Sequence, residues 1–251
     1  CPHHVPIQAY VQKIVQGDFE AAYDLITAKN ALQGICGAVC AHPCEDACIR
    51  GTIDAPVKIR ELKRFVLEYG KAQGWTPAWA KADANGHKVA VVGAGPAGLA
   101  CASELRKAGY EVTVFEKENT AGGMIKFGIP DYAMKKEVLD NEVKVLAENG
   151  VNFEFGKELG KDITIDSIKA MGYEAVFAAI GSGKKVTADV KGVDKAIDAV
   201  ELLKAIALGN AEKLCGNVVV AGKGFAAMDA ARSALRCGAK DVRIVYRRRQ
   251  D

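Results

Sequence analysis

Apolar residues recur every three or four positions through the first 74 residues, which is the spacing of amphipathic helices. The clearest groups lie at 11–15, 21–26 and 59–69. The stretch 34–51 between them contains three glycines and one proline, so we expect irregular backbone there. The first part of the chain is therefore predicted to be a small helical domain.

The pattern changes after a linker at 75–86. Short runs of consecutive apolar residues now alternate with helical periodicity, which is typical of parallel strands joined by helices. Two such βαβ units are predicted. The first has strands at 88–92 and 111–115 around a helix ending near 107, and the second has strands at 217–221 and 241–246 around a helix at 226–237.

These elements predict an α/β protein with two Rossmann-like dinucleotide-binding domains, the second incomplete, preceded by a small α-helical domain. We expect the helical domain at 1–80, the first dinucleotide-binding domain at 87–186 and the second at 187–251. Both larger domains then have the architecture that binds nucleotides at the carboxyl ends of its strands.

Composition excludes several classes of protein. The formal net charge of +3 over 251 residues is too small to indicate a nucleic-acid partner, and no run of 18 apolar residues predicts a membrane span. Nothing at the start resembles a secretory signal, so we expect a cytoplasmic protein. The chain opens at Cys1 without an initiator Met and stops inside the second predicted domain, so we expect it to be part of a longer one.

The first strand runs directly into a G-x-G-x-x-G sequence that opens the helix, the context in which this motif binds dinucleotides. Gly93 permits a tight turn, Gly95 leaves space for a pyrophosphate, and Gly98 lets the helix pack against the strand. Glu116 at the end of the next strand suits ribose hydroxyls and would repel a 2′-phosphate. A turn needed only for packing is the alternative. The predicted site comprises Gly93, Gly95, Pro96, Ala97, Gly98, Glu116 and Lys117.

The second unit carries G-x-G-x-x-A at the same place, followed by a strand that ends in arginines. Guanidinium groups match a phosphate bidentately, so Arg247 and Arg248 predict a 2′-phosphate. The alternative is a basic strand end in solvent, and Lys223 either adds charge near the pyrophosphate or points to solvent. The predicted site comprises Gly222, Lys223, Gly224, Phe225, Ala226, Ala227, Arg247 and Arg248.

The two predicted sites differ in the ribose that they suit. One fits an unphosphorylated ribose and the other a phosphorylated one, which implies two different dinucleotides. FAD and NADPH are the simplest such pair, with hydride passing from nicotinamide to flavin.

Half of the eight cysteines stand at uniform spacing in one short segment, at Cys36, Cys40, Cys44 and Cys48. Thiolates gathered between glycines and prolines, in a chain with a full α/β core, favour metal ligands over disulfide staples. Structural zinc and disulfides are the alternatives. Zinc sites usually hold two close cysteine pairs around a longer spacer, which this run fits less well.

Five stretches together resemble one family, and they span nearly the whole chain. The sequence is similar to the NADPH-oxidising flavoprotein module of the glutamate synthase small (beta) subunit. The same module is found at the N-terminus of dihydropyrimidine dehydrogenase and in the large subunit of bifurcating NADH-dependent ferredoxin:NADP transhydrogenases. The matching stretches are Cys1-Pro2, the cysteine run with 56–65, then 89–118, 122–130, and the second glycine turn with 228–232.

In this family a helical N-terminal domain holds two [4Fe–4S] clusters with crossed ligation. The resemblance implies one cluster on Cys1, Cys40 and Cys44. It implies a second cluster on Cys48 and three cysteines upstream of this chain, with Cys36 nearby but not ligating.

The chain departs from the family pattern at two places. Lys63 stands where relatives offer Gln or Glu as a cluster ligand, and because an ammonium cannot ligate iron, the fourth ligand of the first cluster is left open. The second glycine turn reads Gly-Lys-Gly-Phe at 222–225 where relatives have Gly-Gly-Gly-Asn.

The resemblance also implies that the loop after Glu116 runs near the flavin ring, while a plain glycine loop is the alternative. Gly181, at the end of the strand that closes the flavin domain, is expected to allow a close approach of backbone to ligand. The loop residues assigned to this site are Gly122, Gly123, Met124, Gly128, Ile129 and Pro130.

As a whole, the resemblance implies an NAD(P)H-dependent oxidoreductase that relays electrons through FAD and [4Fe–4S] clusters to a partner domain or subunit. No side chain is expected to be essential as an acid or base, and we expect a hetero-oligomer without nucleic acid. The rival is a non-catalytic scaffold subunit whose nucleotide sites have decayed. A module like the glutamate synthase small subunit is favoured, and the alternative terminal acceptors are ferredoxin, hydrogenase and pyrimidine-reducing partners.

Overall fold

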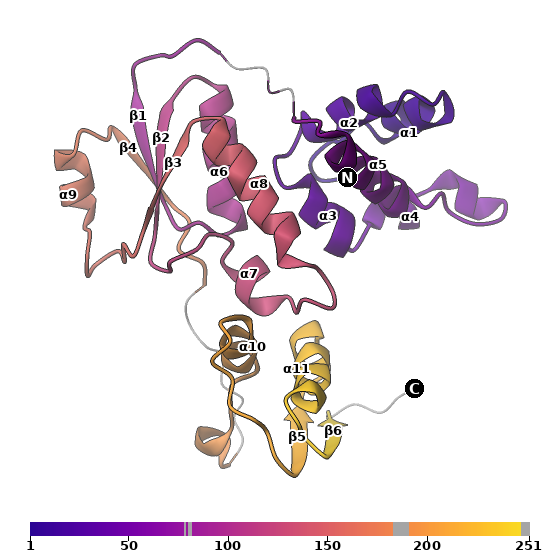
Figure 1. Cartoon of the computed structure of the whole chain (residues 1–251), viewed down its shortest axis with the longest axis vertical. Coiled ribbons are helices and arrows are strands. Elements are labelled where there is room, and N and C mark those ends of the chain that lie inside the picture. The colour runs from indigo at the N-terminus through magenta and orange to yellow at the C-terminus, as the bar shows by residue number, and fades with distance from the viewer. Residues whose placement is uncertain (78, 80–81, 183–190, 247–251) are drawn as a thin grey trace. The chain divides into compact units, whose positions relative to one another are not determined.

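The computed structural model describes residues 1–77, 79, 82–182 and 191–246 (Figure 1). Two of the predicted site residues, Arg247 and Arg248, lie outside the described residues. The chain divides into two compact units. One unit comprises Cys1–Gly122 and Lys136–Gly181, and the other comprises Gly123–Lys135 and Ser182–Asp251.

The first unit begins with a group of helices, as the apolar spacing predicted (Figure 1). Tyr10, Ile26 and Val66, one from each of the three longer helices, are almost completely buried and form the centre of its core. The elements are α1 Ile7–Val15, α2 Phe19–Thr27, α3 Gln33–Val39, α4 Pro43–Asp46, the 3-10 helix η1 Ile49–Thr52, and α5 Ile59–Gln73.

The expectation of irregular backbone over 34–51 was wrong, because α3, α4 and η1 occupy most of that stretch. Glycine costs only about 1 kcal/mol in a helix, and a packing contact can offset that amount. Gly34 and Gly37 lie on α3 where other helices come close. Pro43 is the first residue of α4, where its missing N–H has no helical partner to lose. These residues therefore start and pack the short helices.

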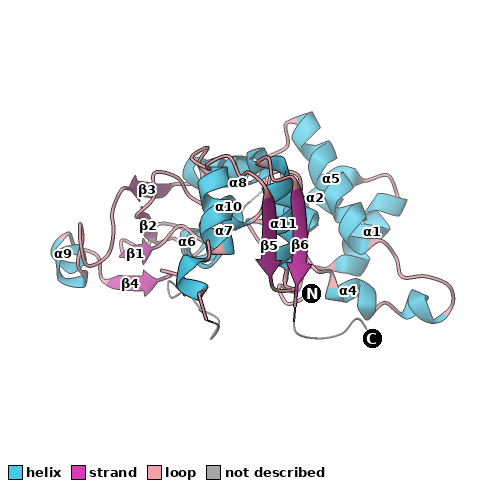
Figure 2. Ribbon diagram, turned by 90° about the horizontal axis from the view of Figure 1, so that it is seen from below, coloured by secondary structure: helices cyan, strands magenta, loops and turns pink. Residues whose placement is uncertain are grey.

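Four parallel strands form the sheet of the first unit, in the order β3-β2-β1-β4 (Figure 2). The two inner strands are buried at all positions but the first, as expected for strands in the middle of a parallel sheet. The elements are β1 Lys88–Val92, α6 Pro96–Lys107, β2 Glu111–Glu116, α8 Lys136–Glu148, β3 Val151–Phe155, α9 Ile165–Ala170 and β4 Ala175–Ala178.

The second unit contains the second predicted βαβ arrangement, in which α11 joins the parallel strands β5 and β6 (Figure 2). The α/β class and both βαβ units are thus confirmed. None of the described helices is long and apolar enough to cross a bilayer. The elements are α7 Met124–Gly128, the 3-10 helix η2 Val193–Lys195, α10 Ala199–Ala207, β5 Asn217–Ala221, α11 Phe225–Arg236 and β6 Asp241–Val245.

Within the first unit, the helical part meets the sheet part where α8 packs on α3 (Figure 1). Oε1 of Glu142 on α8 accepts a hydrogen bond from the N–H of Gly34 in the first turn of α3. A Cβ added at Gly34 would stand 2.9 Å from Val138 Cγ1 and 3.0 Å from Glu142 Oε1. The absence of a side chain at Gly34 therefore permits this joint.

Replacing Gly34 tests the joint. Gly34→Ala should lower the free energy of unfolding by about 1–3 kcal/mol, because the new methyl group crowds Val138 and Glu142. Gly37 lies on the same helix, but a Cβ there would stand 3.4 Å from its nearest neighbour, which is an ordinary contact. Gly37→Ala should be neutral or stabilise by up to about 1 kcal/mol. Urea unfolding of both variants would contradict this account if the two effects were equal.

Candidate functional site

The first glycine turn joins β1 to α6 through backbone that glycine adopts most easily. Gly93 has a φ of +106°, and its N–H donates to the carbonyl of Phe115 at 2.7 Å. A Cβ added at Gly93 would overlap the carbonyl of Ala179, and one added at Gly98 would overlap the carbonyl of Gly93. These two glycines are therefore required by the packing of the protein itself.

Gly95 differs, because nothing lies within 4 Å of the place where its Cβ would stand. Its backbone is extended, with a φ of −75°, so no strain requires glycine either. Packing alone explains Gly93 and Gly98 but leaves Gly95 unexplained. Open space therefore lies in front of α6 at Gly95, and the N–H groups and dipole at a helix N-terminus favour an anion such as a pyrophosphate.

Glu116 ends β2 and ties the glycine turn to the strand end. Its Oε2 accepts from the N–H of Ala94 at 2.6 Å, and its Oε1 accepts from the N–H of Glu118 at 2.9 Å. Only 6% of the residue is exposed. A carboxylate has about four acceptor positions, so ribose hydroxyls can still donate to it. Lys117 beside it is exposed.

The second glycine turn repeats this geometry in the second unit. The N–H of Gly222, with a φ of +142°, donates to the carbonyl of Val245 at 2.9 Å, as Gly93 does to Phe115. A Cβ added at Gly224 would have nothing within 4 Å. In both turns the middle glycine thus faces open space.

The residues around the second turn differ in exposure. Lys223 and Ala226 are exposed, Ala227 is buried, and 90% of Phe225 is exposed. Phe225 is the first residue of α11 and stands at the edge of the open space beside Gly224. Since Arg247 and Arg248 lie outside the described residues, their role at a 2′-phosphate stays a prediction.

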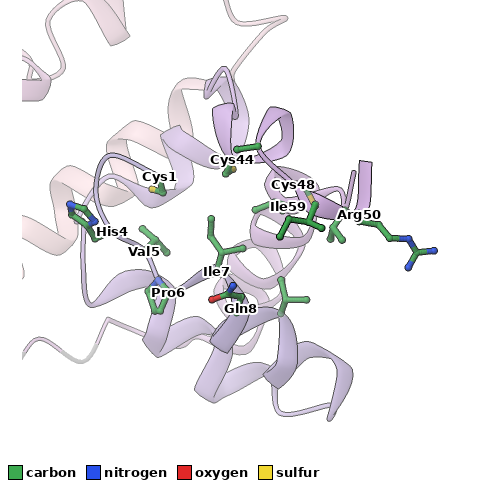
Figure 3. Close-up of a pocket in the computed structure, with 14 residues that line it drawn as sticks. Cys1, His4, Val5, Pro6, Ile7, Gln8, Cys44, Cys48, Arg50 and Ile59 are labelled. Atoms are coloured by element: carbon green, nitrogen blue, oxygen red, sulfur yellow. The ribbon is translucent and has the colours of Figure 1, made fainter. Parts of the chain in front are cut away.

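Cys1, Cys44 and Cys48 line a cavity of about 610 Å³ in the helical part of the first unit (Figure 3). Most of the other wall residues are apolar and come from the first helix, its preceding loop and the segment 49–59. A smaller space of about 40 Å³ shares part of this wall and is lined by Cys1, Cys40 and Cys44. The structure therefore brings together the three cysteines expected on one cluster and places Cys48 on the larger cavity.

Backbone N–H groups surround two of these sulfurs. Hydrogen bonds from the backbone of Val57, Arg50 and Gly51 hold the pKa of the Cys48 thiol below its ordinary value. The N–H of His42 donates to the sulfur of Cys40 at 3.3 Å. Such bonds stabilise thiolates and are one means by which proteins hold iron–sulfur clusters.

Neither alternative for the cysteines, a disulfide or a preformed zinc site, is present among the residues that the structure describes. All eight cysteines are free thiols, so no disulfide forms. Within the described ranges, no three His, Cys, Asp or Glu side chains gather closely enough to hold a single metal ion, as a preformed zinc site would.

Cys36 lines neither cavity. Its sulfur accepts a hydrogen bond from Asn30 Nδ2 at 3.6 Å, and burial raises the pKa of its thiol. The role expected for Cys36, beside the clusters without ligating, stays a prediction.

Two cations line the smaller space together with its cysteines. Lys63 Nζ donates to Gln33 Oε1 at 3.3 Å, and Arg60 Nη1 donates to the carbonyl of Cys40 at 3.1 Å. Positive charge here would offset the negative charge of a thiolate-bound cluster. The sequence identified Lys63 as a departure from the family but gave no sign of Arg60 or Gln33, because only the fold brings Arg60 to Cys40 and Gln33 to Lys63.

Glu142 is a buried acid that no sequence signal marks. Its Oε1 is held by α3, while its Oε2 is buried without a hydrogen-bond partner among the described residues. Burial raises the pKa of this carboxyl group to about 8. Hydrogen bonds from the backbone of Gly34 and Ile35 and the positive charge of Lys63 lower the pKa, but by less than burial raises it. In the sequence, Glu142 is simply one of several acids on an amphipathic helix.

Two family models match the chain. The model described as dihydropyrimidine dehydrogenase domain II, 4Fe-4S cluster, matches residues 1–75. The model described as pyridine nucleotide-disulphide oxidoreductase matches residues 87–250. The first match covers both cysteine-lined cavities, and the second covers both glycine turns.

Known proteins match over the whole chain. It is 39% identical, over 99% of its length, to the NADP(+)-dependent formate dehydrogenase subunit beta of Moorella thermoacetica, of which it covers 39%. It is 35% identical, over 100% of its length, to the NADPH glutamate synthase small chain of Halomonas elongata, of which it covers 56%. The chain thus spans between two fifths and just over half of the length of these relatives.

A solved structure supports the fold. The oxidoreductase FprA of Mycobacterium tuberculosis aligns with 64% of this chain and 44% of its own, with a TM-score of 0.54 and 22% sequence identity. At that identity the match shows a shared fold and nothing finer.

Substitutions of Gly95, which faces open space, and of Gly98, which packing requires, should have different effects in the first turn. Gly95→Ala should leave the free energy of unfolding within about 0.5 kcal/mol but reduce the FAD retained per chain, because its methyl group occupies ligand space. Gly98→Ala should destabilise by about 1–3 kcal/mol, because its methyl group overlaps the carbonyl of Gly93. Flavin content and urea unfolding measure both. Full FAD retention in Gly95→Ala would contradict this assignment.

The raised pKa of Glu142 predicts a pH dependence of stability. Between its ordinary pKa of 4.5 and about 8, the folded chain keeps a proton that the unfolded chain has lost. Stability should therefore fall as pH rises through this window, by up to about 1.4 kcal/mol per pH unit, and level off above it. Glu142→Gln should remove this component. Urea midpoints of both proteins at pH 6, 7 and 8 test it, and a constant difference between them would refute it.

Proposed function

Because the chain belongs to the pyridine nucleotide-disulphide oxidoreductase family over residues 87–250, we propose that it is the NADPH-oxidising part of an electron-transfer enzyme. The resemblance found in the sequence is confirmed, including the [4Fe–4S] domain at residues 1–75. FAD, a nicotinamide nucleotide and [4Fe–4S] clusters are the cofactors of this combination of domains. When bound, they would supply hydride acceptance and single-electron transfer.

The observation that carries the proposal is the open space at Gly95 and Gly224. Each glycine lies at the N-terminus of a long helix, and neither is required by packing. Two helix N-termini that both face free space fit two pyrophosphates, one for each dinucleotide.

The residues of the chain would bind and orient the groups. Glu116 would receive the ribose hydroxyls of FAD beside the first turn, and the second turn would hold NADPH, with Arg247 and Arg248 at the 2′-phosphate. Both named relatives are NADP-dependent by name, which supports this choice. Cys1, Cys40, Cys44 and Cys48 would hold clusters at the cavities that they line. No side chain is proposed as a catalytic acid or base.

The electrons are proposed to leave to a partner subunit. One relative is named a beta subunit and the other a small chain, and they belong to two different enzymes. If one module serves different enzymes, the residues that bind the final electron acceptor would lie on the partner subunit. The partner would therefore decide which acceptor is reduced. We place this complex in the cytoplasm, where thiols stay reduced.

Anaerobic absorption spectra of the intact protein test the function. Flavin absorption over a broad iron–sulfur background should bleach with one equivalent of NADPH, and more slowly with NADH. Arg247→Ala combined with Arg248→Ala should reduce the preference for NADPH by about tenfold to a hundredfold, since hydrogen bonds between charged groups are lost. Equal bleaching by NADH in the parent would contradict the choice of NADPH. A flavin that neither nucleotide changes would contradict the proposed activity itself.

A further inference from the structure

The segment 122–135 follows the first dinucleotide site in sequence, but most of it folds with the second. Gly123–Lys135 belongs to the second compact unit, whereas the chain on both sides of it belongs to the first. At its start, the N–H of Gly122 donates to the carbonyl of Ala94, inside the first glycine turn, at 2.8 Å. Near its end, Tyr132 contacts α11, the helix that begins at the second glycine turn.

Tyr132 is held by α11 in two ways. Its hydroxyl donates to Asp229 Oδ1 at 2.8 Å, and the guanidinium of Arg236 lies 4.1 Å from the centre of its ring. Arg232 in turn lies 3.6 Å from Asp229 and keeps that carboxylate paired. A cation over a ring and a hydrogen bond to a carboxylate are each modest alone, but together they fix both the position and the direction of the side chain.

The rest of the segment is anchored to the same unit. Ile125 and Phe127 of α7 are buried, and the ammonium of Lys204 on α10 lies 5.2 Å from the centre of the Phe127 ring. The chain leaves the first unit at Gly122 and Gly123, with φ values of +123° and +51°. Only glycine adopts such angles without strain, so the crossing point depends on these two glycines, while the part beyond it is fixed to the second unit.

We propose that the segment 122–135 couples the two nucleotide sites, and that Tyr132 is a positioning residue which fixes this segment to the pyridine-nucleotide helix α11. The inference rests on the proposed function. Hydride transfer requires its two partners to be held at close contact, and a small misplacement lowers the rate without lowering affinity. The contacts of Tyr132 given above lie on α11 rather than in either glycine turn. Tyr132 is therefore not proposed to bind a nucleotide. Tyr132 would act by keeping the segment 122–135, which is bonded to the first glycine turn at Gly122, in a fixed position on α11, the helix at the second nucleotide.

Tyr132→Phe removes the hydroxyl but leaves the ring for Arg236. In the intact protein, the FAD content and the dissociation constant of NADP⁺ should stay within about twofold of the parent, while the single-turnover rate of flavin reduction by NADPH should fall about tenfold. Tyr69→Phe is the matched control, because the Tyr69 hydroxyl has no hydrogen-bond partner among the residues that the structure describes. That variant should match the parent in all three measurements.

Hydrogen exchange supplies a readout that does not depend on turnover. NADP⁺ should slow amide exchange in both α11 and the segment 123–135 of the parent, but only in α11 of Tyr132→Phe. Tyr132→Ala, which also removes the ring, should show the same loss. Equal protection of 123–135 in the parent and both variants would overturn the coupling, as would unchanged rates of flavin reduction.

The outcomes also separate this inference from the function on which it rests. If NADPH does not reduce the flavin of the parent, the proposed function fails and the coupling fails with it. If the parent is reduced and the variants behave like the parent, the coupling alone is wrong.

Discussion

The close approach of a helix to the end of a strand is the constraint on which the nucleotide sites depend. α6 comes so near to β1 that a side chain at Gly98 would overlap the carbonyl of Gly93. In the second unit, a Cβ added at Gly222 would stand 3.2 Å from the Cβ of Ala227, which is a tight contact. Each helix then points its free N–H groups at the space beside a middle glycine. Anion binding follows from this backbone geometry and needs no charged side chain.

A second close approach links the helical part to the sheet part of the first unit. Gly34 lets α8 pack on α3, and Glu142 binds the N-terminal turn of that helix. The opposite end of α3 is capped by Cys40, which lines the smaller cysteine cavity. The helix that carries Glu142 therefore helps to position a cysteine expected to ligate iron. Electron transfer between domains depends on distance, so a stiff joint at this point suits the proposed relay.

Local pattern was sufficient to predict the two βαβ units, because strand burial, helix periodicity and glycine turns are all encoded within a few residues. The predicted strand ends agree with β1, β2, β5 and β6 to within one residue. Contacts between distant segments could not be predicted in the same way. Gly34 and Gly37 look alike in the sequence, yet only Gly34 faces α8 closely.

The same limit applies to the candidate sites. The middle glycines were predicted from a motif, and the structure shows the open space that explains them. Glu142 and the contact between Tyr132 and Asp229 escaped prediction, because each joins segments about a hundred residues apart and no motif marks either member. The cysteines were predicted as a group from spacing, but their division between two cavities depends on the fold of α3, α4 and η1.

The most direct test of the relay is electron paramagnetic resonance of the intact protein, frozen at intervals after anaerobic mixing with NADPH. The account predicts that NADPH first reduces the flavin. The signal of reduced [4Fe–4S] clusters should then grow as the flavin passes its electrons to them and is reoxidised. Complete flavin reduction beside clusters that stay oxidised, although dithionite reduces them, would contradict the central claim that this chain passes electrons from NADPH to iron–sulfur clusters.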